Sequence, residues 1–494
     1  MRKSLPKEFE AYTQKLMGKD LYECLEKGIQ EQDVPTSIRL NPFKVKENTH
    51  VADTFNSSAI EGREDLVPWS PLYGRYLKER PNFTFDPLFH AGLYYAQEAS
   101  SMMVDFVIRQ LVHSPVRMLD LCAAPGGKTT ALRAALPEGS LLFSNEPMRT
   151  RSQILAENVQ KFGHPDVIVT NNYPCDYKKS KLLFDIILTD VPCSGEGMFR
   201  KDEGAIDEWS TKNVENCWQL QREIVSDIWH CLKPGGILIY STCTFNAHED
   251  EENVDWIAQE LGADYLTLPI EEAWHITGNL IHQDEQHPVY RFLPGKTRGE
   301  GLFLAVLRKH GNYEEGMEEN KEKKKNKKDK GNKAKNNKGG KDALFTMLNQ
   351  WLQPMEQGYE YISGTDGVYA IPNRWTSVYQ DATKTLKVIH AGIKMGTDKG
   401  KGIIPDQSLS LSILLNKKAF PNIELSYEEA LRFLRKEAIN LPTDTPKGYA
   451  LVTYRGFPLG WEKNIGNRAN NLYPQEWKIK SSYMPEQDKM VIEW

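Results

Sequence analysis

Residues 116–130, Val-Arg-Met-Leu-Asp-Leu-Cys-Ala-Ala-Pro-Gly-Gly-Lys-Thr-Thr, decide the fold of this chain. Val116 to Cys122 is a short apolar run of the kind that forms a buried strand. The run breaks at Pro125-Gly126-Gly127, and the residues from Thr129 onward are typical of a helix. A strand that turns through glycines into a helix lets backbone N–H groups approach a ligand closely. The stretch therefore predicts a ligand-binding turn, with a purely structural strand–helix turn as the alternative.

The spacing of the glycines separates three kinds of ligand. A dinucleotide fingerprint needs G-x-G-x-x-G, whereas only the adjacent pair Gly126-Gly127 is present here. A P-loop needs G-x-x-x-x-G-K-[ST], and although Gly127-Lys128-Thr129 matches its end, Cys122 occupies the place of the first glycine. The incomplete motifs weaken the case for both ligands that contain a pyrophosphate. S-adenosyl-L-methionine, which carries no phosphate, is therefore the better candidate.

Strand-like and helix-like patterns alternate from residue 96 to residue 310. Strands are expected at 116–122, 140–146, 166–171, 184–190, 236–242 and 302–308, and helices at 97–112, 127–136, 149–162 and 214–232. This alternation predicts an α/β fold with a mostly parallel, doubly wound Rossmann-like sheet. Ligands of such sheets bind at the carboxyl ends of the strands.

Polar side chains stand at those strand ends. Glu146 closes the second strand and is expected to accept hydrogen bonds from a ribose diol, with a surface helix cap before Pro147 as the alternative. Asn171 or Asn172 closes the third strand and is a candidate for an adenine contact.

An acid and two thiols follow the fourth and fifth strands. Asp190 and Cys193 lie in Asp-Val-Pro-Cys-Ser-Gly-Glu-Gly at 190–197, and Cys243 lies in Ser-Thr-Cys-Thr-Phe at 241–245. A single cysteine is more often a small buried hydrophobe, but two at neighbouring strand ends favour chemistry, with a redox pair as the rival. Methylation of cytosine at C5 explains this combination, because a thiolate must add to C6 before C5 can attack a methyl group. An acid can hold the activated ring, and a second group must move a proton when the thiol is released.

The motifs resemble the RNA cytosine-5 methyltransferases of the Nol1/Nop2/Sun family, in particular the bacterial 16S rRNA methyltransferases of the RsmF type. The resemblance rests on Cys122–Lys128 (CAAPGGK), Asn145-Glu146, the 190–201 segment and the 241–245 segment, in the family's order and spacing. It extends to Tyr94-Tyr95-x-Gln97-Glu98 and to a C-terminal stretch, GYALVTYRGFPLGW, like the family's PUA-type RNA-binding domain.

The resemblance implies a role for each matching residue. Cys243 would be the nucleophile, Cys193 would assist product release, and Asp190 would hold the base and the methionine end of the cofactor. The cofactor loop would comprise Cys122, Ala123, Ala124, Pro125, Gly126, Gly127 and Lys128. Two departures are visible: Val191 replaces the usual alanine, and Asn171-Asn172-Tyr173 lacks the third-strand acid that often contacts adenosine.

The bulk composition limits other classes of function. The seven cysteines form no C-x-x-C pair, so neither a disulfide framework nor a zinc site is expected, and no metal is predicted. Neither a membrane-spanning run nor a secretory signal is expected, so we predict a cytoplasmic monomer. Residues 321–341 carry a net charge of +9, which leaves −14 on the remainder because the whole chain carries −5. Any RNA must therefore be bound by local basic surfaces.

Five segments are expected. They are an N-terminal RNA-binding or substrate module at 1–95, the methyltransferase domain at 96–311, a Lys-rich disordered linker at 312–342, an α+β domain at 343–410, and a PUA-like domain at 411–494. By resemblance the partner is 16S rRNA or the 30S subunit, modified near the decoding region. The alternatives are the same chemistry on tRNA or 23S rRNA, and an RNA-binding ribosome-assembly factor with an inactive methyltransferase fold.

Overall fold

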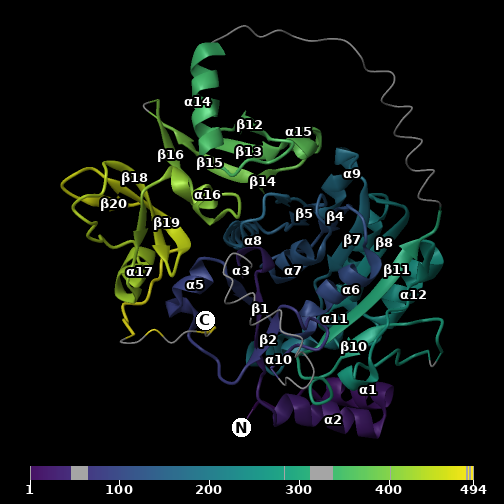
Figure 1. The fold of residues 1–494 in the computed structure, drawn as a ribbon. Coiled ribbons are helices and arrows are strands. Elements are labelled where there is room, and N and C mark those ends of the chain that lie inside the picture. The colour runs from purple at the N-terminus through teal and green to yellow at the C-terminus, as the bar shows by residue number, and fades with distance from the viewer. Residues whose placement is uncertain are drawn as a thin grey trace, which may run out of the picture.

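A nine-stranded mixed sheet forms the centre of the molecule (Figure 1). The computed structural model describes residues 2–45, 65–282, 284–311, 338–400, 402–485, 488 and 491–492. The strand order is β10-β11-β8-β7-β4-β5-β6-β14, and β9 pairs with β11. The bounds are β4 Arg117–Asp120, β5 Leu141–Asn145, β6 Val167–Thr170, β7 Phe184–Asp190, β8 Leu232–Thr242, β9 Ala263–Tyr265, β10 Tyr290–Phe292, β11 Leu302–Lys309 and β14 Val388–Ala391.

The five central strands are parallel. The strand order changes direction at β4, so the topological switch point lies between β4 and β7. From β4 the chain moves outward through β5 and β6, then returns to the other side of β4 with β7 and β8. The carboxyl ends of β4 and β7 therefore define the crevice in which doubly wound sheets bind ligands. The predicted Rossmann-like core is confirmed.

Helices cover both faces of this sheet because alternate strand residues point to opposite sides. Met118 packs with one helical layer and Leu119 with the other. The first layer contains α6 Met103–Leu111, α7 Gly127–Ala135 and α8 Arg149–Phe162. The second contains α9 Tyr177–Ser180, α11 Thr211–Trp229, α12 Glu251–Glu260 and α15 Thr376–Thr383.

The N-terminal region is a small α+β unit packed beside this core. It comprises α1 Lys7–Met17, α2 Lys19–Gln30, α3 Pro42–Val45, α5 Pro87–His90 and a sheet of β1 Thr36–Leu40, β2 Gly74–Leu77 and β3 Tyr94–Ala96. The first two helices, α1 and α2, are separated by a single residue. Gly18, with φ of 74°, separates α1 from α2 because a left-handed residue ends an α-helix.

The C-terminal region contains two further sheets. The first combines β12 Tyr359–Ser363, β13 Val368–Pro372, β15 Ile393–Asp398 and β16 Ile403–Pro405, with α14 Lys338–Gln350 and α16 Gln407–Leu411 beside it. The second combines β17 Asn422–Glu424, β18 Gly448–Tyr454, β19 Phe457–Asn464 and β20 Ala469–Asn471, with α17 Tyr427–Leu434. β12 and β13 form a hairpin around Gly364–Gly367, and Ser426 and Glu429 form a capping box at the start of α17.

One strand lies in a different sheet from the one its position in the chain suggests. β14 falls within the predicted domain 343–410, yet it pairs antiparallel with β6 and forms one edge of the methyltransferase sheet. Arg374 and Asp166 add an ion pair between the same two regions. The predicted linker at 312–342 lies outside the described residues up to 337, and α14 begins at Lys338. Across the described ranges, no helix is both long and apolar enough to cross a membrane.

Candidate active site

The strand ends bring most of the predicted site residues to one edge of the sheet. The loop after β4, the end of β7 and the start of α7 enclose a pocket of about 230 Å³. Its lining consists of Tyr95, Ala96, Gln97, Glu98, Ser101, Asp120, Cys122, Ala123, Ala124, Pro125, Gly127, Lys128 and Asp190. Gly126, Glu146, Asn171, Cys193 and Cys243 are not among the residues that line it.

The loop from Cys122 to Lys128 is held from behind by the helix that follows the next strand. Arg151 donates to the carbonyl of Ala124 (3.0 Å), and Asn158 donates to the carbonyl of Pro125 (2.8 Å), both from α8. Gly126 caps α7 with φ of 113°, a conformation that favours glycine. The first backbone N–H groups of α7 lack helical partners and can serve an anionic group of a ligand.

Asp120 is the site residue that the sequence analysis missed. One carboxylate oxygen accepts a hydrogen bond from Thr129 (2.6 Å), whereas the other is buried and has no partner among the residues that the structure describes. Burial and the nearby Asp190 raise the pKa of Asp120 to about 7. The available signal was an acid two residues before Cys122 in an otherwise apolar run, since buried acids need a partner. The amino group of a bound amino acid moiety would satisfy this oxygen.

Glu146 lies just outside that pocket at the end of β5. Only 2% of its surface is exposed. One oxygen accepts from the backbone N–H of Met148 (2.9 Å), and the other lies 3.5 Å from Arg151. These contacts fix the carboxylate while leaving lone pairs for a ribose diol, so the residue fits its predicted role.

Asn171 is mainly engaged in contacts within the protein. Its amide nitrogen donates to the carbonyls of Glu146 (2.9 Å) and Pro147 (2.8 Å), which uses both of its hydrogens. Its carbonyl oxygen accepts from Lys387 (2.9 Å). A contact to adenine would have to use the remaining lone pair of that oxygen. Asn171 thus supports the turn that carries Glu146 and joins it to the C-terminal region.

Lys128 and Asp190 form an ion pair across the mouth of the pocket. The ammonium lies 2.8 Å from one oxygen of Asp190, and the hydroxyl of Ser241 donates to the other oxygen at 2.7 Å. Burial alone would lower the pKa of Lys128, but Asp190, and to a lesser extent Cys243, raise it overall. Lys128 is therefore a fixed positive charge between the cofactor pocket and a thiol.

The two predicted thiols lie side by side. The Sγ atoms of Cys193 and Cys243 are 3.2 Å apart, and the backbone N–H of Cys243 points to Cys193 Sγ at 3.5 Å. The hydrogen bond to Cys243, followed by burial, raises the pKa of Cys193 well above its usual value. Cys193 is thus held as a thiol that can donate a hydrogen bond to the sulfur of Cys243.

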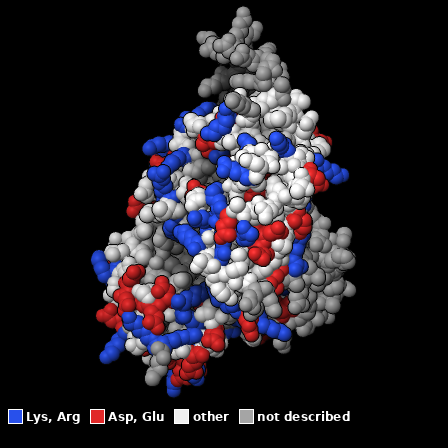
Figure 2. All heavy atoms as spheres, turned by 90° about the vertical axis from the view of Figure 1, so that its left-hand side faces the viewer, with Lys and Arg blue, Asp and Glu red and all other residues white. Residues whose placement is uncertain are grey.

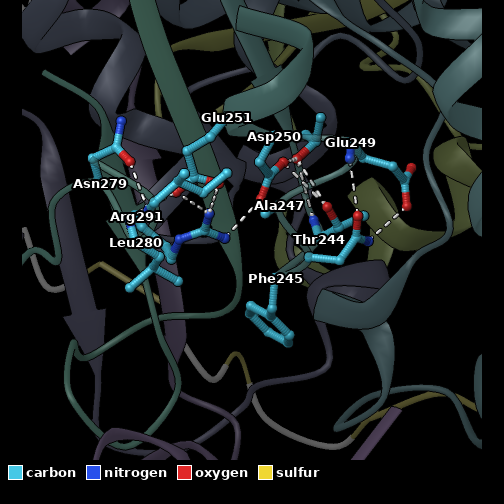
Figure 3. Close-up of polar contacts among 12 residues, drawn as sticks. Thr244, Phe245, Ala247, Glu249, Asp250, Glu251, Asn279, Leu280 and Arg291 are labelled. Atoms are coloured by element: carbon cyan, nitrogen blue, oxygen red, sulfur yellow. Dashed lines mark hydrogen bonds and ion pairs between the residues drawn. The ribbon is translucent and has the colours of Figure 1, made fainter. Parts of the chain in front are cut away.

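Asp250 fixes the loop that carries Cys243. Its carboxylate accepts hydrogen bonds from the hydroxyls of Thr242 (2.5 Å) and Thr244 (3.2 Å), which flank Cys243. Its other oxygen lies 2.6 Å from the guanidinium of Arg291 (Figure 3). The loop that carries Cys243 is therefore anchored to a buried ion pair.

Arg291 pairs with two acids at the start of α12: Asp250, which is the N-cap of the helix, and Glu251, which is its first residue. It contacts Asp250 and Glu251 (both at 2.6 Å), and none of the three side chains is exposed. Figure 3 shows Arg291 between these acids, with Leu280 on the far side of Glu251, whose carboxylate accepts from the Leu280 N–H at 3.1 Å. Charges buried to this extent require such pairing.

Glu196 and Glu249 hold the two thiol loops together. Glu196, from the loop after Cys193, accepts from the backbone N–H groups of Phe245 (2.7 Å) and Asn246 (3.1 Å). Glu249, from the segment after Cys243, accepts from the Ser194 N–H at 3.0 Å. Burial, with a further contribution from Glu249, raises the pKa of Glu196 to about 7. Each loop is thereby tied to the other by a carboxylate.

The fold and the site define a methyltransferase that uses S-adenosylmethionine. The topological switch point carries the glycine loop, and the pocket offers a fixed lysine–aspartate pair together with an unsatisfied carboxylate oxygen. This donor set suits the amino acid end of the cofactor, and Glu146 suits its ribose.

Family comparisons identify the methyltransferase more closely. Residues 112–308 match the family described as 16S rRNA methyltransferase RsmB/F. Residues 5–99 match the N-terminal domain of 16S rRNA methyltransferase RsmF, and residues 420–479 match the methyltransferase RsmF PUA domain.

Relatives extend along nearly the whole chain. Ribosomal RNA small subunit methyltransferase F of Aliivibrio salmonicida is 30% identical over 481 residues, which cover 96% of this chain and 97% of that protein. The protein of the same name from Klebsiella pneumoniae is 29% identical and covers 89% of each chain. The chain therefore belongs to the RsmB/F family of 16S rRNA methyltransferases and is of the RsmF type.

Solved structures agree on the fold. A methyltransferase homologue from Pyrococcus horikoshii superposes with a TM-score of 0.52 at 24% identity, over 62% of this chain and 95% of that one. NSun6 from Pyrococcus horikoshii superposes with a TM-score of 0.50 at 19% identity, over 62% of this chain and 99% of that one.

Proposed function

We propose that this chain methylates C5 of a cytosine in 16S rRNA, near the decoding region of the small subunit, through a covalent adduct at Cys243. The observation that carries the proposal is the pair of thiols 3.2 Å apart at neighbouring strand ends, next to Lys128 and Asp190. A redox pair would explain the two thiols but not the adjoining ion pair and cofactor loop. The substrate class rests on the RsmF relationship along the whole chain.

The first step uses Cys243 as the nucleophile. The Cys243 thiolate forms a bond to C6 of the cytosine, and the electrons of the C5–C6 double bond move into the ring and make C5 nucleophilic. Lys128 stabilises the negative charge of thiolate and ring, because it is a fixed cation in a largely buried site. Asp190 accepts a hydrogen bond from the exocyclic amine of the base.

The second step restores both the ring and the enzyme. Bound S-adenosylmethionine supplies the methyl group to C5 and leaves as S-adenosylhomocysteine. The C5 proton must then depart while the C6–S bond breaks and returns its electron pair to Cys243, so each cycle releases one proton. Cys193 is the neighbouring group that can relay this proton: its thiol donates a proton to the departing sulfur of Cys243, 3.2 Å away, and takes up the C5 proton in its place.

Transfer of labelled methyl groups tests the reaction and the substrate together. The substrates are unmodified 16S rRNA, 23S rRNA, bulk tRNA, 30S subunits and 50S subunits, each with the wild type and Cys243→Ala. Cys175→Ala is the matched control, because this thiol is exposed and is not among the residues that line the cofactor pocket. We expect label in 16S rRNA or 30S subunits that disappears only in Cys243→Ala. Label confined to tRNA or 23S rRNA would overturn the substrate, and full activity in Cys243→Ala would overturn the nucleophile.

The role of Cys193 has its own readout. If Cys193 assists release, Cys193→Ala should accumulate a covalent RNA–protein adduct that survives a denaturing gel. Finding only free enzyme under turnover conditions would exclude that role. A wild type that binds 16S rRNA but neither binds S-adenosylmethionine nor transfers label would support the assembly-factor alternative.

A further inference from the structure

A basic groove lies between the N-terminal region and the segment before β11. It has a volume of about 630 Å³ and is separate from the cofactor pocket. The N-terminal side contributes residues 32–36 together with Leu77, Lys78 and Arg80, and the opposite side contributes Arg200 and residues 295–298. A second hollow of about 320 Å³ shares Lys296, Thr297 and Arg298 with the groove and continues it.

The lining of this groove has a strong excess of positive charge. It contains the cations Lys78, Arg80, Lys296 and Arg298 and the acid Asp33, whereas the charge of a fifth cation, Arg200, is balanced by the buried Glu300. The chain as a whole carries −5, and the face that displays the C-terminal region mixes both signs of charge (Figure 2). The excess is therefore a local property of the groove.

Several of these cations are placed to meet a ligand. Lys78 and Arg80 are exposed, and within the described ranges neither forms an ion pair. Arg298 is also exposed and stacks on the ring of Tyr76 at 4.0 Å, which orders its guanidinium. Lys296 donates to Thr277 at 2.8 Å. Fixed but solvent-accessible charges of this kind suit phosphate groups.

The groove is connected to the thiols through a short segment. Arg200 donates to the carbonyl of Gly299 at 2.6 Å and pairs with Glu300 at 2.8 Å. At Gly301 there is no room for a side chain, because a Cβ atom would lie 2.9 Å from the Cα of Gly197. Gly197 in turn donates its N–H to the carbonyl of Cys243 at 2.7 Å. Since three residues span at most about 10 Å, the basic groove ends close to the nucleophile loop.

We propose that this groove binds the sugar-phosphate backbone of the RNA strand that adjoins the target nucleotide. The proposal rests on the proposed function in taking the nucleotide at Cys243 to belong to an RNA. Because the lining offers cations rather than a set of amides aimed at base edges, the groove positions the strand and does not read its sequence. Recognition of sequence is thereby left to other parts of the chain.

The test compares two double charge reversals. Lys78→Glu with Arg80→Glu alters the groove, whereas Lys7→Glu with Lys15→Glu makes the same change in net charge on exposed positions of α1, outside the groove. Binding of a fluorescein-labelled unstructured RNA is measured by anisotropy at several salt concentrations. Methyl transfer to a 16S rRNA transcript and binding of S-adenosylmethionine are measured on the same preparations.

We expect the groove variant to bind RNA about tenfold or more weakly and to have a smaller salt dependence, by roughly 0.7 in slope for each phosphate that the groove no longer neutralises. The KM for 16S rRNA should rise in parallel, while the affinity for S-adenosylmethionine and the melting temperature stay unchanged. The α1 variant should resemble the wild type.

Two results would overturn the groove assignment: RNA binding by the groove variant equal to that of the wild type, or equally weakened binding in both variants. Neither depends on the reaction. If the wild type transfers no methyl group but the groove variant still binds RNA more weakly, the groove stands and the proposed function falls.

Discussion

The cofactor pocket and the support of the two thiols are built in different ways. The loop from Cys122 to Lys128 is held by hydrogen bonds from side chains of α8 to its backbone carbonyls, and α8 is the next long helix in the chain after α7. The loops of Cys193 and Cys243 are instead held by buried carboxylates and by Arg291 from the distant strand β10. The first arrangement depends on local geometry, whereas the second depends on charges that must remain paired. We therefore expect the thiol side to be far more sensitive to substitution of supporting residues.

The largest expected effect is the loss of Arg291. Arg291→Met leaves Asp250 and Glu251 buried without their cation, and removal of one partner of a buried pair costs about 3–5 kcal/mol. The free energy of unfolding from urea titration should fall by that amount, and methyl transfer should fall with it. Arg308→Met on β11 is the control, because Arg308 is exposed and should change stability by no more than about 0.5 kcal/mol.

Equal stability of the two arginine variants would show that the buried network does not support the thiol loops. If Arg291→Met fails to fold, Thr242→Val provides the milder test, since it removes one hydrogen bond to Asp250 and leaves the ion pair intact. That variant should be destabilised by about 1–2 kcal/mol.

The second largest effect is expected where the two regions meet. Lys128→Met removes the cation between Asp190 and Cys243. In the proposed mechanism this cation stabilises the charge that develops on the ring. We expect kcat/KM to fall by about 100-fold, as for the loss of one group that stabilises a transition state electrostatically. Unfolding in urea should change by less than in Arg291→Met. Single-turnover transfer at saturating cofactor separates this loss from weaker binding, and an unchanged single-turnover rate would contradict it.

A smaller effect is expected in the reactivity of the thiols. Cys243 raises the pKa of Cys193, so at pH 8 iodoacetamide should modify Cys193 more slowly than the exposed Cys175. In Cys243→Ala the main cause of the raised pKa is gone, so the thiolate fraction of Cys193 at pH 8 increases and its alkylation should become faster. Peptide mass spectrometry measures both rates, with Cys175 as the internal reference. Slower alkylation of Cys193 in the variant would contradict the coupling.

The two regions also differ in how far they can be predicted from sequence. β7 matches its predicted range, 184–190, because a continuous apolar run ending in an acid and Val-Pro marks both ends of a buried strand. Arg291 could not be predicted, because nothing in its neighbourhood shows that acids 40 residues earlier will surround it. β14 was missed for a similar reason, since an edge strand is selected by backbone pairing with β6 and not by its own periodicity. Local patterns predict elements and their ends, but not the long-range pairings that support them.

The smallest effect is expected for the substitution of Asn171. The measurement distinguishes recognition of adenine by this residue from support of the cofactor pocket. Asn171→Ala removes two hydrogen bonds to the turn that carries Glu146, so the affinity for S-adenosylhomocysteine should fall by about threefold, less than the cost of a fully buried hydrogen bond. The affinity for its inosine analogue should fall by the same factor, because the turn supports the ribose contact and not the base. Lys387→Ala removes only the hydrogen bond to the side-chain carbonyl oxygen of Asn171 and should leave the affinities for both ligands unchanged. Calorimetry with the two ligands distinguishes the two roles of Asn171. If Asn171 contacted adenine directly, Asn171→Ala would no longer discriminate between S-adenosylhomocysteine and its inosine analogue.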